Sequence, residues 1–168
     1  MRKRSWSLLM MALALLALVF GGCGQKSSST NKVSDAARTV IETFMTCPNE
    51  DLYNDTMKGA IGSGTEKISD EEWEKINAAY EKVSENWEKA IGKYFADNSL
   101  EKFVDDGYVN RYMSEGKQMK VESMELLEKD DSTEKVKVTA LVEDKEQEIT
   151  VEFKYNLDGR IWKVNLIE

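Results

Sequence analysis

The sequence contains no histidine, only two cysteines and a single proline among its 168 residues. The absence of histidine excludes His-based acid–base catalysis, Ser-His-Asp and Cys-His nucleophile systems, and every metal site that uses imidazole. Two cysteines, Cys23 and Cys47, are too few for a cysteine zinc site or a disulfide scaffold. We expect Cys47 to be a small buried hydrophobe at a helix end rather than a nucleophile.

Basic residues are outnumbered by acidic ones, and the full chain carries a formal charge of −8. Residues 1–22 hold three basic side chains and no acidic one, so the chain without them is at about −11. Binding to nucleic acid needs a basic patch, so this balance argues against a nucleic-acid partner. It also argues against electrostatic adhesion to anionic lipid.

The first 23 residues read MRKRSWSLLMMALALLALVFGGC. Three basic residues precede an apolar run from Leu8 to Phe20, which ends on two glycines and Cys23. This order is typical of an export signal. A run of about 13 residues is shorter than the roughly 20 that cross a bilayer as a helix.

The small residues and cysteine at the end of this signal resemble a bacterial lipoprotein lipobox, although Phe20 stands where an aliphatic residue is usual. The resemblance implies that residues 1–22 are a cleaved signal peptide and that Cys23 carries acyl chains, palmitate among them. The protein would then be anchored at the extracytoplasmic face of the cell membrane. The alternatives are an ordinary secretory signal or an uncleaved anchor, with Cys23 incidental. Gly24 is not the Asp that commonly retains lipoproteins at an inner membrane.

Residues 24–32 are polar and rich in serine, so we expect residues 23–32 to be a flexible tether and residues 33–168 a single domain.

Ser34 is a candidate cap for a first helix that ends near Cys47, before Pro48. A short helix over Glu50–Met57 is also predicted. Ser69 and Glu72 form a capping-box signature ahead of a long helix. Its apolar stripe consists of Trp73, Ile76, Tyr80, Val83, Trp87, Ala90, Ile91 and Tyr94. Gly92 should mark the bend or end of this long helix. Asn98 is a candidate cap for a further short helix.

From Met119 onwards the apolar period changes from helical to alternating, which predicts strands with one buried face. With Asp144-Lys145 as a hairpin loop, Ala140 opposes Ile149, Val138 opposes Val151 and Val136 opposes Phe153. With Asp158-Gly159 as the next loop, Tyr155 opposes Trp162, Phe153 opposes Val164 and Val151 opposes Leu166. A bulge near Glu122–Glu125 would place Val121 and Leu126 of the preceding strand on one face.

Helices followed by a bent strand and an antiparallel meander indicate an α+β fold, with N-terminal helices packed on a curved antiparallel sheet. Over residues 33–168 this order resembles the nuclear transport factor 2-like (cystatin-like) superfamily, whose members curl a sheet around helices into a cone. The catalytic sets of that superfamily do not transfer, because histidine is absent and no catalytic Asp can be aligned.

Three functions follow as hypotheses. The first is a tethered, non-catalytic binding or accessory domain that holds a small apolar ligand or an envelope protein. Its candidate pocket lining is Trp73, Trp87, Tyr94, Tyr108, Tyr112, Phe153, Tyr155 and Trp162, although an aromatic stripe more often fills a core. The second is a His-free enzyme with a buried carboxylate and a tyrosine, for which Asp105, Asp106 and Tyr108 are candidates. The third is a purely structural interaction with another envelope protein.

No cofactor or metal is expected. Charged residues alternate with threonines on the outward strand face, which suits a large apolar contact poorly. We therefore expect a monomer.

Overall fold

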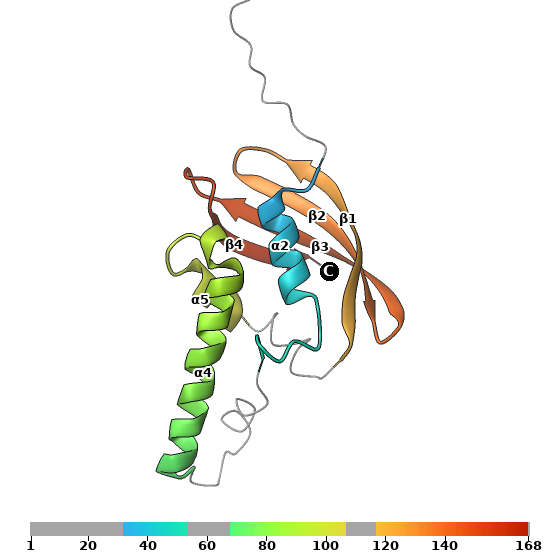
Figure 1. Cartoon of the computed structure of the whole chain (residues 1–168). Coiled ribbons are helices and arrows are strands. Elements are labelled where there is room, and N and C mark those ends of the chain that lie inside the picture. Colours follow the sequence, from blue (N-terminus) through green and yellow to red (C-terminus); the bar gives the residue numbers. More distant parts are fainter. Residues whose placement is uncertain (1–31, 54–67, 107–116, 168) are drawn as a thin grey trace, which may run out of the picture. The chain divides into compact units, whose positions relative to one another are not determined.

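Helices precede strands in the computed structural model, which describes residues 32–53, 68–106 and 117–167 (Figure 1). The strands form one antiparallel sheet in the order β1-β2-β3-β4. The predicted α+β class is therefore confirmed. All described residues belong to one compact unit that extends from Asn31 to Glu168. In this part of the chain, no helix has both the length and the apolarity needed to cross a membrane.

Helix α2 (Asp35–Phe44) begins where the sequence predicts, because the Ser34 hydroxyl accepts a hydrogen bond from the Ala37 amide at 3.1 Å. One face of the helix, formed by Ala37, Val40, Ile41 and Phe44, is buried. The helix ends at Phe44, three residues before the predicted end. The reason is that Cys47 exchanges two backbone hydrogen bonds with Met119, at 2.9 and 3.0 Å, and so leaves the helical path. Cys47 is buried, and burial raises the pKa of its thiol.

Helix α4 (Asp70–Ile91) begins with the predicted capping box, in which Ser69 and Glu72 bond each other's backbone amides. Ile76, Val83, Trp87 and Ile91 of the predicted stripe are buried, whereas Trp73 and Tyr80 are 45% and 41% exposed. The helix ends at Ile91, and a 3-10 turn, η2 (Gly92–Tyr94), follows as the predicted break.

Helix α5 (Ser99–Asp105) follows Asn98, whose positive φ of 60° turns the chain before the helix. Phe103 points from α5 into the core. The predicted helix over Glu50–Met57 appears as a turn in its described part, and its remainder lies outside the described residues.

Strand β1 (Met119–Lys129) pairs with β2 (Thr133–Val142), and the register shifts at Glu122 and again at Leu127. The first shift is the bulge that the sequence predicts. It leaves Val121 and Leu126 half-buried beside the core, as that prediction requires.

The hairpin between β2 and β3 (Lys145–Tyr155) differs from the predicted one by two residues in pairing. Val138 opposes Ile149, not the predicted Val151. Val136 opposes Val151, not the predicted Phe153. The two-residue loop is Glu143-Asp144, with φ of 51° and 61°, which matches the twist of the strands. A shift of two residues keeps every side chain on its face, and the predicted buried face is therefore correct.

The hairpin between β3 and β4 (Ile161–Ile167) contains the predicted pairs Phe153–Val164 and Val151–Leu166. The predicted pair Tyr155–Trp162 is wrong, because Tyr155 opposes Ile161. A register shift leaves Trp162 as the extra residue of a bulge, where it is 49% exposed while Ile161 is buried.

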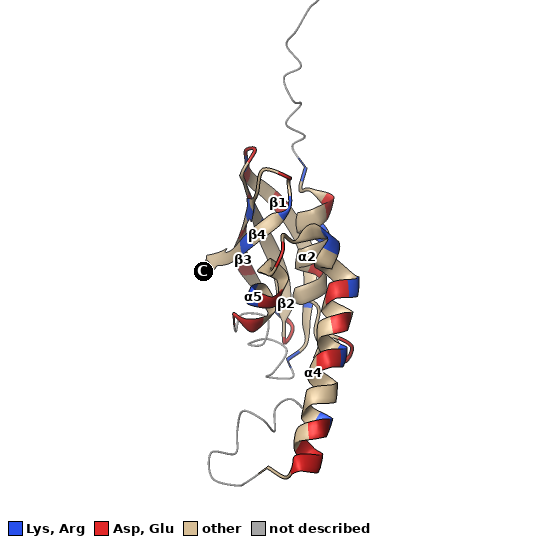
Figure 2. Cartoon of the chain, turned by 90° about the vertical axis from the view of Figure 1, so that its left-hand side faces the viewer, with Lys and Arg blue, Asp and Glu red and all other residues tan. Residues whose placement is uncertain are grey.

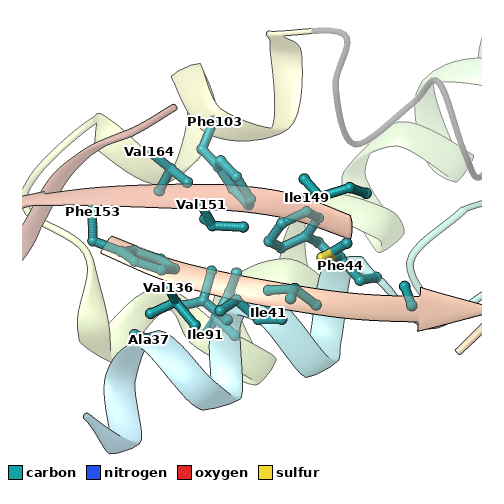
Figure 3. Close-up of a cluster of buried hydrophobic side chains, with 14 of the residues drawn as sticks. Ala37, Ile41, Phe44, Ile91, Phe103, Val136, Ile149, Val151, Phe153 and Val164 are labelled. Atoms are coloured by element: carbon teal, nitrogen blue, oxygen red, sulfur yellow. The ribbon is translucent and has the colours of Figure 1, made fainter. Parts of the chain in front are cut away.

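The core lies between one face of the sheet and the helices. Ala37 and Ile41 of α2 face Val136 of β2, and Phe103 of α5 lies over β3 and β4 (Figure 3). The Phe103 ring packs edge-on against Phe44 and Trp87, with ring centroids 5.4 and 6.4 Å away. Side chains therefore fill the space against this face of the sheet.

Candidate functional site

A groove of about 1270 Å³ lies between α4, α5 and the turn that contains Leu52 and Tyr53. It opens to solvent, and it lies outside the packed layer between α2 and the sheet. Its volume exceeds the range of roughly 300–1,000 Å³ that is usual for small-molecule pockets. Size and position make it the candidate binding site.

The floor of the groove is apolar. It is formed by Leu52, Val83, Trp87, Phe95, Leu100 and Val104. The Trp87 indole N–H donates a hydrogen bond to the Leu52 carbonyl oxygen at 3.1 Å, which fixes the turn against α4. Phe95 stacks on Phe103 with ring centroids 5.4 Å apart, and this contact joins the groove floor to the core. The hydrogen bond of Trp87 and the ring contact of Phe95 therefore fix the position of the groove floor.

The rim of the groove is acidic. Its carboxylates are Glu81, Glu85 and Glu88 from α4, Asp97 from the connecting turn, and Glu101 and Asp105 from α5. One basic residue, Arg160, belongs to the described lining, and it already pairs with Asp97 at 3.0 Å. Glu85 pairs with Lys89 at 3.1 Å. Among the described residues the other four carboxylates have no basic partner. Figure 2 shows red acidic segments along α4, with fewer blue basic ones.

Of the eight aromatic residues that the sequence proposes as a pocket lining, Trp87 lies in this groove. Phe153 is fully buried in the core. The half-buried Tyr94 has its hydroxyl 3.5 Å from the Thr39 hydroxyl. Trp73 and Trp162 are half exposed at separate places, the first turn of α4 and the start of β4. Tyr155 belongs to another cluster described below, and Tyr108 and Tyr112 lie outside the described residues.

Several groove residues were not singled out by the sequence, notably Leu52, Tyr53 and Phe95. Tyr80 carried a signal, because it stands seven residues from both Trp73 and Trp87 on one helix face. Leu52 and Phe95 carried none, since their roles depend on a turn and a break that place them beside α4.

A second polar cluster surrounds Glu134, whose side chain is fully buried. Its Oε1 accepts a hydrogen bond from the Ser34 amide at 2.7 Å. Its Oε2 accepts from the Tyr155 hydroxyl at 2.9 Å and from Lys129 Nζ at 3.1 Å. Burial alone would raise the pKa of Glu134, but these hydrogen bonds outweigh burial and hold its pKa below the ordinary value.

This cluster is a structural clamp. Glu134 is held charged, and burial, followed by the effect of the Glu134 charge, holds the pKa of Tyr155 above its ordinary range. Neither group is poised to exchange a proton near neutral pH. A smaller hollow of about 400 Å³ is lined by Val33, Arg38 and Met124 but includes neither Glu134 nor Tyr155. The candidate catalytic residues Asp105 and Asp106 are both exposed, and Tyr108 lies outside the described residues.

No protein-family model matches this chain, and neither does any curated protein or solved structure.

Proposed function

We propose that the protein is a lipoprotein anchored at the extracytoplasmic face of the cell membrane by acyl chains on Cys23, after removal of residues 1–22. The basic start, the apolar run to Phe20 and the Gly-Gly-Cys end support this proposal. Two acyl chains hold a protein stably on a bilayer, whereas one holds it only marginally. The proposal extends to the cone-like arrangement of the nuclear transport factor 2-like superfamily, supported by helices on one face of an antiparallel sheet.

In this proposal the folded domain is a non-catalytic binding or accessory module. The observation that carries it is the groove between α4 and α5, with an apolar floor and an acidic rim. An apolar surface with a few placed charges is the usual form of a binding site. A His-free enzyme would need a carboxylate of perturbed pKa facing open space. In the described residues the buried carboxylate is Glu134, which is enclosed by its partners.

Replacement of Cys23 by Ser tests the anchor. Cells that express the natural chain and C23S are given a fatty acid that carries an alkyne label. The natural chain is expected to take up the label and to sediment with membranes, whereas C23S takes up none and is released. Labelling of C23S to the natural extent would show that Cys23 is not the acceptor.

Site-specific photo-crosslinking in cells tests the groove. A photoreactive phenylalanine analogue replaces Tyr80 in the groove and, as the matched control, Trp162 on β4; both side chains are exposed aromatics. A defined adduct at position 80 that is absent at position 162 is expected, and mass spectrometry identifies it. An adduct at position 162 alone would contradict the proposal and favour a purely structural contact through the sheet.

A further inference from the structure

We infer that the occupant of the groove is a cationic amphipathic helical segment of a partner protein, lying along α4. The inference rests on the proposed function, because it takes the groove to be a binding site. It adds the charge, the shape and the macromolecular class of the ligand.

The charge of the occupant follows from the rim. Glu81 and Glu88 stand on the α4 side and Glu101 on the α5 side, and none of the three has a basic partner among the described residues. Carboxylates on both walls would repel an anionic ligand. A wholly apolar ligand would displace water from them without replacing its hydrogen bonds. Lysine or arginine side chains on the occupant would satisfy both walls.

The amphipathic character follows from the exposed apolar surface between those walls. Tyr80 is 41% exposed, and Leu100 and Val104 on the facing helix are only partly buried. Apolar side chains of an occupant would cover this surface and remove it from water. The same ligand thus needs an apolar face and basic flanks.

The length follows from the stretch of α4 that is accessible from Trp73 to Glu88. Trp73, Tyr80 and Trp87 are spaced by seven residues, and this spacing keeps them on nearly one face of the helix. The first and last are about 21 Å apart along the axis at the usual rise of a helix. Trp87 is buried in the groove floor, whereas Tyr80 at the groove and the half-exposed Trp73 beyond it are accessible on the same face of α4.

Such a line favours a helix over a small cation. A small amphiphile would fill only part of about 1270 Å³ and would leave Trp73 uncovered. A partner helix of about four turns would reach from Trp73 to the exposed Glu88, and its basic residues could also lie over the exposed rings of Trp73 and Tyr80. Helix-in-groove recognition is a general mode of peptide binding.

The test uses the chain from Gly24 to Glu168, which contains the whole compact unit. The probes are an amphipathic helical peptide of about 18 residues made of Leu and Lys, and the same peptide with Glu for Lys. Fluorescence anisotropy of the labelled peptides gives each dissociation constant. The groove variant is E81Q/E101Q, and the matched control is E146Q/D131N, which removes two exposed carboxylates away from the groove.

The Lys peptide is expected to bind and the Glu peptide not to bind. Affinity for the Lys peptide should fall about tenfold in E81Q/E101Q and less than about twofold in E146Q/D131N, because only the first pair faces the ligand. Urea midpoints equal to that of the natural chain confirm that both variants fold.

An equal loss in both variants would show attraction to general negative charge and would overturn the inference. Failure of the Lys peptide to bind would also overturn it. If crosslinking at position 80 still gives a defined adduct, the proposed function stands and only the ligand class is wrong. If that adduct is absent too, the proposed function falls with it.

Discussion

Glu134 is the buried charged side chain of the described structure, and it joins two segments that lie 100 residues apart in the sequence. Its carboxylate receives the amide of Ser34, which caps α2, and the hydroxyl of Tyr155 at the end of β3. A buried charge is tolerated only when it is paired and hydrogen-bonded. The cluster therefore ties the start of the domain to the sheet.

Replacement of Glu134 by Gln should lower the free energy of unfolding by about 1–3 kcal/mol. The amide nitrogen of Gln cannot accept the bonds from Tyr155 and Lys129 that one carboxylate oxygen now accepts. Urea denaturation at pH 7 measures the change. Glu128→Gln is the control at an exposed position, where we expect at most about 0.5 kcal/mol. Equal losses in the two variants would contradict the clamp.

The natural chain and E134Q also give a test of how stability depends on pH. The folded-state pKa of Glu134 is lowered, so its stabilising effect is present above the unfolded pKa, near 4.3, and is lost as pH falls through the folded pKa. Gln does not titrate. The stability gap between the natural chain and E134Q should therefore narrow as the pH falls below about 4.3. A gap that stays constant down to pH values near 2 would show that Glu134 is not held charged.

Among the elements, the loop between β2 and β3 decides the pairing of the sheet. Both of its residues have positive φ, and Asp144 at 61° occupies a conformation that costs a residue with a Cβ atom about 1 kcal/mol. Glu143 also contacts the residue before β1, since its carboxylate accepts a hydrogen bond from the Gln118 amide at 2.7 Å.

Substitutions at Asp144 should rank by their tolerance of positive φ. D144G is expected to raise the free energy of unfolding by about 0.5 kcal/mol, and D144A to lower it by about 1 kcal/mol. Thermal or urea unfolding of the three proteins measures the order Gly, Asp, Ala. If Ala is as stable as Gly, the loop does not use this conformation.

On the scale of the whole molecule, the outward face of the sheet is covered by ion pairs. Lys135 lies 2.7 Å from Glu128, and Lys137 lies 3.2 Å from Glu125 and 3.4 Å from Glu148. Exposed pairs of this kind add little stability, but they keep the face polar. The exposed Trp162 and Ile167 are single apolar residues on β4, which is an edge strand.

We therefore expect the chain from Gly24 to Glu168 to be a monomer. Stable interfaces bury about 1,600 Å² and concentrate apolar residues, which this face does not offer. Sedimentation velocity at micromolar concentration should give one species of monomer mass. A dimer that resists dilution would contradict this, and a Trp162→Lys variant would then show whether β4 forms the contact.

Much of this architecture could be predicted from local sequence chemistry. Ser34 and Ser69 mark the helix starts because a hydroxyl cap acts within three residues of its partner amide. Alternation along β2 correctly assigns Val136 and Val138 to the buried face, and the same parity places Glu134 there.

Features that depend on distant contacts were missed or misplaced. The end of α2 depends on Met119, and the exposure of Trp162 depends on a bulge that alternation does not reveal. The groove could not be predicted, because its floor joins residues from three separate segments. These are the turn with Leu52, the stretch from Trp87 of α4 to Phe95, and helix α5 with Leu100 and Val104.

The sequence by itself determined the leader pattern, the excluded chemistries, the order of helices and strands, and the buried face of the strands. These depend on composition and on neighbours within one or two turns of chain. Only the tertiary structure decided which strand residues pair, which aromatics are covered, and where apolar surface stays open beside unpaired carboxylates. The physical reason is that burial and pairing arise from segments far apart in sequence, such as Ser34 and Glu134, whose meeting no local pattern encodes.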